Sequence, residues 1–411
     1  MDRAQDPLHS LGIVQAWSSS QHGLEFNRRL DETARLQSRP SNGQRSTVNP
    51  SPPPSTSPSR ETSQDAKMIL TVAPTLRTWF APAIDAIFAP GLPFSYRWRL
   101  LVLQPLSLIT YSIQALPWVF RRSCPFKAEY ITVAPGRTLR ILVFNKTKSS
   151  KTGLRPLHLD IHGGSFLGGL PESNAHFCAR LAEETGAAVF ATSYRYAPVH
   201  PFPAAIDDVD VVLAYLRQHV AAKYGADPDL VTVSGDSAGG NLALATSLSV
   251  KPGVVKASVT FYASINLHLS PGEKPPPQLP KGKKDPMRFL YPLFDSYAAK
   301  AKKDDGNNQR LSPYFADLKD LPGDMLLVVP GIDLVVREQL GFVERLRGEI
   351  ERDTEGRYKG RRVEALFVEK GFHGYLGLPS VIVGQELKDQ AWDAGVRFIQ
   401  DAHRKSGWRW P

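Results

Sequence analysis

Gly235-Asp236-Ser237-Ala238-Gly239 is the part of this chain whose residue types and spacing most directly predict chemistry. It comes directly after the strand-like sequence LVTVS and directly before the helix-like sequence AGGNLALATSL. A serine between two glycines at a strand-to-helix turn is typical of an exposed nucleophile, because so sharp a bend needs small neighbours. The dipole of the following helix would favour negative charge near the hydroxyl. We therefore predict that Ser237 attacks a carbonyl carbon; a plain tight turn is the alternative.

The sequence HGGSF at residues 162–166 predicts a site for the negative charge that such an attack creates. Attack on a carbonyl group produces an oxyanion, and one backbone N–H aimed at it can contribute roughly 3 kcal/mol to catalysis. Glycines let the backbone approach a substrate closely, although an ordinary glycine-rich turn is the alternative. His162 precedes the nucleophile and is expected to brace this loop. The expected donors are the amides of Gly163, Gly164, Ser165 and Ala238.

A serine hydroxyl needs a base to remove its proton, and the base needs a carboxylate to fix its orientation. His373 lies in the loop after the strand-like sequence VEALFV, and Asp333 lies in the loop after MLLVV. The carboxyl ends of parallel strands meet at one edge of a sheet, where the active sites of α/β proteins gather. We therefore predict that His373 is the base for Ser237 and that Asp333 orients it.

Strand-like and helix-like segments alternate along the chain from about residue 130 onwards. Two short strands at 130–133 and 139–144, separated by a Pro-Gly pair, predict a β-hairpin. Apolar residues at three-to-four spacing predict a helix at 203–224. Such alternation predicts an α/β fold with a mostly parallel central sheet and helices on both faces. The other expected strands are 157–161, 187–193, 230–233, 257–262, 325–329 and 363–368, and the other expected helices are 175–185 and 392–402.

Three parts are predicted from local composition. Residues 1–67 are polar and rich in proline and are expected to form a disordered tail, so Met68 is an alternative start of translation. Residues 68–125 are expected to form an apolar cap or a membrane-associated segment. Residues 126–411 are expected to form the catalytic domain, with a lid insertion at 264–308 that interrupts the alternation.

Residues 100–120 contain no charged side chain and have arginines on both sides. A stretch of this length can span a bilayer. Pro105 and Pro117 instead favour a broken helix that covers a pocket or lies on a surface. A cap or core helix is the preferred interpretation, and an interfacial anchor and a transmembrane span are the alternatives.

The overall composition is that of a globular protein with an excess of basic residues. Lys and Arg number 50 against 40 Asp and Glu, which gives a net charge of +10. The basic runs at 281–284 and 359–362 have no interleaved aromatic residues, so solvated loops are expected and no nucleic-acid partner. Cys124 and Cys178 are too few for a disulfide framework and have no metal-ligand spacing. The N-terminus lacks a secretory signal, so an intracellular location is expected, in the cytoplasm or on an internal membrane such as the endoplasmic reticulum.

Together these motifs resemble the hormone-sensitive lipase branch of the α/β hydrolases, a group with an HGGG-type loop and a GDSAGG elbow. The order Ser237, Asp333, His373 is the order of that fold. YRYAP at 194–198 and FPAA at 202–205 are similar to two further motifs of the group, and the resemblance covers residues 125–405. Ser165 departs from the pattern by replacing the third glycine of the loop.

This resemblance implies an α/β-hydrolase fold with a helical cap and hydrolysis of carboxylic esters with small to medium acyl chains. It also implies that no cofactor is needed. The apolar segment at 100–120 resembles membrane-associated members of the group, including steryl acetyl hydrolases of fungi. Contact with a membrane surface through this segment is therefore an alternative, and the oligomeric state is left open.

The aromatic sequence FLYPLFDSY at 289–297 favours a hydrophobic ester as substrate, such as an acetylated sterol, a lipid or a secondary metabolite. An acyltransferase or a lactonase would use the same three residues and is one alternative. A small-molecule receptor that retains the fold without the chemistry is another. Such a receptor commonly loses its serine or histidine, and both are present in this chain.

Overall fold

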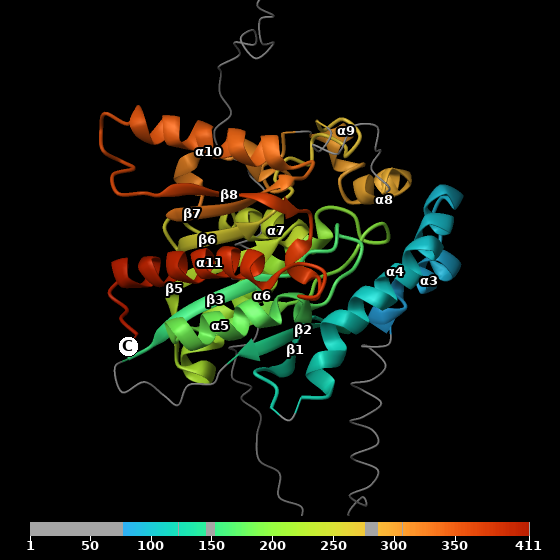
Figure 1. Ribbon diagram of the computed structural model, residues 1–411, viewed down its shortest axis with the longest axis horizontal. Helices are drawn as coiled ribbons and strands as arrows, with labels where there is room; N and C mark the ends of the chain where they lie inside the picture. The colour runs from blue at the N-terminus through green and yellow to red at the C-terminus, as the bar shows by residue number, and fades with distance from the viewer. Residues whose placement is uncertain (1–76, 122, 145–152, 276–286, 306, 411) are drawn as a thin grey trace, which may run out of the picture. The chain divides into compact units, whose positions relative to one another are not determined.

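The computed structural model describes residues 77–121, 123–144, 153–275, 287–305 and 307–410. The tail predicted at 1–67, Met68 and the basic run at 281–284 lie outside the described residues. The described residues contain one eight-stranded sheet in the order β1-β2-β4-β3-β5-β6-β7-β8 (Figure 1). Its strands are β1 (Lys127–Ala134), β2 (Arg137–Phe144), β3 (Arg155–Ile161), β4 (Ala188–Thr192), β5 (Ala226–Asp236), β6 (Val255–Phe261), β7 (Asp324–Ile332) and β8 (Val363–Phe372).

Helices cover both faces of this sheet. The strand β2 pairs antiparallel with β1 and β4, and the pairings from β4 through β3 to β8 are all parallel. Helices α5 and α11 lie on one face, in front in Figure 1, and α6, α7 and α10 pack on the other. This is the predicted α/β-hydrolase architecture. The helices are α3 (Ala81–Phe88), α4 (Phe94–Val119), α5 (Ala175–Thr185), α6 (Ala204–Tyr224), α7 (Ala238–Ser247), the short α8 (Tyr291–Phe294) and α9 (Ala301–Asp304), α10 (Val336–Glu351) and α11 (Gln385–Lys405).

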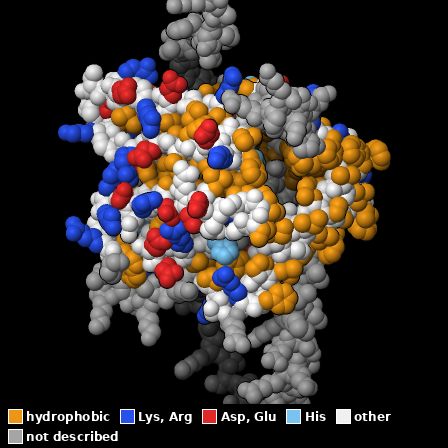
Figure 2. Space-filling model, viewed as in Figure 1, with side chains coloured by type: hydrophobic (Ala, Val, Ile, Leu, Met, Phe, Trp, Pro, Cys, Tyr) orange, Lys and Arg blue, Asp and Glu red, His pale blue; other side chains and the backbone are white. Residues whose placement is uncertain are grey.

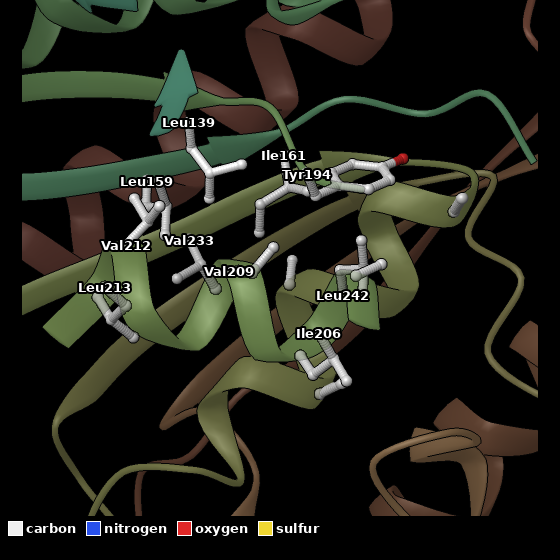
Figure 3. Packing of buried hydrophobic residues seen from close by; sticks show 14 of the residues in the cluster. Leu139, Leu159, Ile161, Tyr194, Ile206, Val209, Val212, Leu213, Val233 and Leu242 are labelled. Atoms are coloured by element: carbon white, nitrogen blue, oxygen red, sulfur yellow. The ribbon is translucent and has the colours of Figure 1, made fainter. Parts of the chain in front are cut away.

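The central strands are buried on both sides because each face of a parallel sheet is covered by its crossover helices. Every residue of β3 and of β4 is buried. On the α6 side, Val209 and Val212 pack against Leu159 of β3 and Val233 of β5 (Figure 3). The core therefore holds the carboxyl ends of the central strands in fixed positions. The loops at that edge begin from these fixed positions.

Most predicted elements are present. The predicted hairpin is β1 and β2, the predicted helix at 175–185 is α5, and several strands extend beyond the predicted bounds. Helix α10 is missing from the sequence-based expectations, although Phe342, Val343 and Leu346 give it a buried apolar stripe. Helix α11 begins seven residues before the predicted start. Its first turns are polar, so the apolar pattern did not indicate them.

The apolar segment at 100–120 lies within one helix, α4, which runs from Phe94 to Val119 without a break. The expectation that Pro105 and Pro117 break it is therefore wrong. A proline in a helix removes one backbone donor and leaves a carbonyl group of the preceding turn without its partner. Both prolines lie on the exposed side of α4, where water can reach those carbonyl groups.

Candidate active site

Ser237 occupies the sharp turn between β5 and α7, with backbone angles φ 51° and ψ −117°. This left-handed conformation is rare for a residue with a side chain. The Ser237 N–H donates to the Phe261 carbonyl at 2.9 Å and helps to hold the turn. A Cβ atom on Gly239 would lie 1.9 Å from the Ile161 carbonyl oxygen, so only glycine fits there. The predicted strand-to-helix turn is therefore present.

Ser237, His373 and Asp333 form a chain of hydrogen bonds at the carboxyl edge of the sheet. Nε2 of His373 lies 2.8 Å from Oγ of Ser237, and Nδ1 of His373 lies 2.7 Å from Oδ2 of Asp333. Oδ1 of Asp333 accepts from the Val335 N–H at 3.2 Å, which fixes the carboxylate. The structure thus brings the predicted serine, histidine and aspartate together, although the serine and histidine are 136 positions apart in sequence.

The surroundings of His373 favour its protonated form. Desolvation lowers the pKa of His373, but the charge and hydrogen bond of Asp333, assisted by the charge of Asp236, outweigh it. The net result is a pKa above the ordinary value of 6.5. A histidine in this environment takes up a proton readily, which suits a general base.

We expect kcat/KM for a neutral ester to fall as the pH is lowered, with a midpoint above about pH 6.5. Only neutral His373 can accept the serine proton, and its raised pKa moves protonation to higher pH. A pH–rate profile from about pH 4 to about pH 9 measures the midpoint. A profile that stays flat down to the acid limit would contradict the assignment of His373 as the base.

Of the four N–H groups expected to donate to the oxyanion, those of Gly164 and Ser165 in the glycine-rich loop after β3 and that of Ala238 at the start of α7 remain available among the described residues. The expectation for Gly163 is wrong, because its N–H already donates to Oδ1 of Asp236 at 2.7 Å. Within the part of the chain that the structure describes, the N–H groups of Gly164, Ser165 and Ala238 donate to no other group. Gly164 has φ 120°, and a Cβ atom there would lie 2.1 Å from the Gly168 carbonyl oxygen.

Ser165 stands where the related motif has a third glycine, and it adopts the backbone conformation of one. Its φ is 54°, and that of the following Phe166 is 60°. A left-handed conformation costs a residue with a side chain roughly 1–2 kcal/mol relative to glycine. The substitution therefore keeps the path of the loop and adds strain beside the site.

Buried aromatic side chains support the glycine-rich loop. His162 is fully buried, its Nδ1 lies 2.7 Å from the Gly163 carbonyl oxygen, and its ring stacks on Tyr194 at 4.5 Å. The Tyr194 hydroxyl donates to the His162 carbonyl at 2.9 Å. Burial lowers the pKa of His162 to about 4, so it stays neutral at physiological pH. These contacts support the expectation that His162 braces the loop.

Asp236 is a site residue that the sequence-based reasoning missed. Its Oδ1 accepts from the Gly163 N–H and from Nδ2 of Asn174, at 2.7 and 2.9 Å. The same Asn174 amide donates to the buried Asp160 at 3.0 Å. Burial raises the pKa of both carboxyl groups, that of Asp160 to about 7. The position of Asp236 beside the nucleophile, inside the glycine motif, is the signal that could have identified it.

Helix α4 also contacts the glycine-rich loop, at Gly168 and Gly169. The Gly169 N–H donates to the hydroxyl oxygen of Tyr111 at 2.9 Å. A Cβ atom on Gly168 would lie 2.3 Å from that hydroxyl, so the tyrosine packs directly on the loop backbone. Tyr111 is only 3% exposed. Nothing in the sequence around residue 111 indicates this contact, because the two partners lie in segments that pair only in the folded chain.

Two cavities meet at Ser237 and His373. The larger has a volume of about 470 Å³ and is lined mainly by the segment after β6. Its charged lining includes Lys274, which pairs with Glu338 of α10 at 2.7 Å. The smaller has a volume of about 280 Å³ and is lined by α4, the glycine-rich loop and the loop after His373. Apolar and aromatic side chains dominate the larger cavity, including Phe166, Leu267, Met287, Phe294, Tyr297 and Ile332.

Comparison with known proteins gives the same fold and a set of relatives. The family model described as alpha/beta hydrolase fold matches residues 158–376, more than half of the chain. Over 133 residues the chain is 38% identical to arylacetamide deacetylase of Oryctolagus cuniculus, covering 31% of this chain and 33% of that protein. Over 266 residues it is 28% identical to gibberellin receptor GID1B of Arabidopsis thaliana, covering 62% of this chain and 70% of that protein. The match to the deacetylase thus spans only about a third of that relative's own length.

The solved structure of an esterase from Pyrobaculum calidifontis is similar to this one. The two share 25% sequence identity and superpose with a TM-score of 0.56. The match covers 76% of this chain and 94% of that esterase. The two chains therefore share the fold that positions the site.

Proposed function

Because the chain belongs to the α/β-hydrolase family, of the hormone-sensitive lipase type, we propose that it is a serine esterase. In this proposal Ser237 is the nucleophile, His373 is the general base and Asp333 orients His373. The observation that carries it is the pair of hydrogen bonds of 2.8 and 2.7 Å that links the three side chains. The similarity to arylacetamide deacetylase and to the Pyrobaculum esterase supports the same activity.

The geometry suits hydrolysis in two steps. His373 takes the proton of Ser237 while the serine oxygen attacks the ester carbonyl, and Asp333 stabilises the imidazolium that forms. The carbonyl oxygen becomes an oxyanion, to which the N–H groups of Gly164, Ser165 and Ala238 can donate. His373 then returns the proton to the leaving alcohol. Water, deprotonated by the same imidazole, attacks the acyl-enzyme, and His373 returns that proton to Oγ of Ser237 as the acid leaves.

The two cavities support a hydrophobic ester with one small and one larger part. The smaller volume of about 280 Å³ fits a short acyl group or a compact alcohol, whereas about 470 Å³ accepts a bulkier apolar group. Aromatic and aliphatic walls favour an acetylated sterol, a lipid or a secondary metabolite. Residues of 264–308 serve as a lid and α3 with α4 as a cap in this proposal. The name of arylacetamide deacetylase is in line with a short acyl group.

A receptor without catalytic activity is the second candidate, favoured by the similarity to gibberellin receptor GID1B. Retention of both Ser237 and His373, in hydrogen-bond contact, supports the esterase instead. An acyltransferase or lactonase would use the same three side chains, so these activities differ from hydrolysis only in the acceptor or the ring of the substrate.

Hydrolysis of nitrophenyl esters with acyl chains from acetate to dodecanoate tests the proposal. We expect turnover of the short and medium esters and a decline for long chains, because the two cavities have volumes of only about 470 and 280 Å³. Rates measured with Ser237→Ala supply the background. Folded protein that hydrolyses none of these esters but binds small apolar ligands would support the receptor. Release of product only when an alcohol acceptor is added would identify an acyltransferase.

A further inference from the structure

We propose that α3 and the outer side of α4 form a docking surface for a membrane that contains anionic lipids. This surface, the cap face, consists of apolar side chains that point away from the protein. Val102 and Ile109 of α4 are 47% and 59% exposed, and Phe88 of α3 is 74% exposed. The cap face comprises Ile87, Phe88, Val102, Ile109, Val119 and Phe120.

The cap face is the largest apolar area in the view of Figure 2, where hydrophobic side chains gather on the right over α3 and α4. Lys, Arg, Asp and Glu side chains are mixed over the left part of the same view. Large contiguous apolar patches are uncommon on monomeric soluble proteins and mark surfaces that contact a partner or a membrane. The cap face is therefore a surface at which we expect a partner or a membrane to dock.

The inner side of α4 is held by the protein, which determines how the helix can meet a membrane. By length and composition α4 could cross a bilayer. Its buried side, however, carries Gln104, whose side chain accepts from the Ala83 N–H and donates to the Trp79 carbonyl, at 2.9 and 3.0 Å. Tyr111, on the same side, binds the Gly169 N–H. A crossing helix would lose these partners in hydrocarbon, so the helix fits in the plane of the interface instead.

The charges around the cap face match anionic lipid headgroups. Asp85 is the single acidic residue between positions 77 and 121. At the two ends of α4, the Arg99 guanidinium lies over the Trp98 ring at 4.3 Å and that of Arg121 over the Trp118 ring at 4.8 Å. Trp118 itself is buried, so the exposed group at that end is Arg121, and arginines beside an apolar surface favour contact with anionic headgroups. A second copy on this face would bring like charges together, which disfavours a dimer here.

The smaller cavity opens beside the cap face. Leu106 of α4 lines that cavity and is 44% exposed, and Gly164 of the glycine-rich loop lines it and is exposed as well. An ester dissolved in the lipid would therefore reach Ser237 along an apolar path. This last step rests on the proposed esterase function, whereas binding to the membrane does not.

Sedimentation with lipid vesicles tests the cap face. The full chain is mixed with vesicles of phosphatidylcholine containing phosphatidylserine, or of phosphatidylcholine alone. The variant V102E/I109E places two charges on the cap face, at positions that line neither cavity. Glutamate is a good helix former, so α4 is retained. The control V381E/I382E adds the same charges at two other exposed apolar residues, near the start of α11.

We expect wild type and V381E/I382E to bind the anionic vesicles, and V102E/I109E to bind them with an affinity lower by about tenfold or more. Hydrolysis of a water-soluble ester should be equal in all three, which separates this proposal from a failure of the esterase function. Wild type that does not sediment with either vesicle overturns the proposal. So does V102E/I109E that sediments like wild type. If wild type is a dimer without lipid and V102E/I109E is a monomer, the cap face is assigned to a second copy instead.

Discussion

Replacing Ser237 by alanine is expected to lower kcat/KM for a short nitrophenyl ester by about 10⁴- to 10⁶-fold. Alanine keeps the Cβ atom and the backbone conformation of the turn but removes the oxygen that lies 2.8 Å from Nε2 of His373. What remains is stabilisation by the N–H groups and binding in the cavities. Steady-state hydrolysis measures the loss, and labelling with a fluorophosphonate probe, which reacts with activated serines, gives a second readout.

Ser264→Ala is the matched control for this change. Ser264 lines the larger cavity, and its backbone N–H donates to the Ser237 carbonyl at 3.3 Å, a contact that alanine retains. Its rate should change by less than about tenfold, and the probe should still label the protein. Wild-type turnover in folded Ser237→Ala would show that another residue is the nucleophile.

Asp333→Asn is expected to lower kcat by about 10⁴-fold. An asparagine amide can donate to Nδ1 of His373, which leaves the proton on Nε2, where the serine proton has to go. The lost negative charge also removes the main cause that raises the pKa of His373. The acid limb of the remaining activity should therefore move to lower pH, and a pH–rate profile of the variant measures this shift.

Asp295→Asn provides a carboxylate control in the same larger cavity. Asp295 forms an ion pair with Lys302 and accepts from the Ser270 hydroxyl at 3.1 Å, away from His373. We expect a change of less than about tenfold and no shift of the acid limb. Equal losses in the two variants would mean that Asp333 acts through the general charge of the cavity and not through orientation of His373.

The sheet could be predicted because its strands and helices depend on local sequence. The meeting of Ser237, Asp333 and His373 could then be predicted from where the strands end. Continuous apolar strands, helical spacing and glycines at the turns fix where each strand ends, and parallel strands bring their carboxyl ends to one edge. The side chains that follow those ends then have little freedom. Helix α10 was missed because its buried stripe is narrow and its other residues are charged.

The partners of the glycine-rich loop could not be predicted to the same degree. The sequence gives no reason to distinguish the N–H group of Gly163 from those of Gly164 and Ser165. Only the position of Asp236 in the folded chain decides which of them already has an acceptor. The unbroken course of α4 is a second example. Its prolines are tolerated because they face solvent, and the side that each faces depends on tertiary packing. Local propensity contains neither piece of information.

The contact between Tyr111 and Gly169 bears on where this chain can be divided. A shortened protein that starts at residue 126 would keep every side chain of the hydrogen-bonded chain at Ser237, yet it would lose one wall of the loop that faces the reacting oxygen. The segment ahead of the first strand is thus not a detachable appendage.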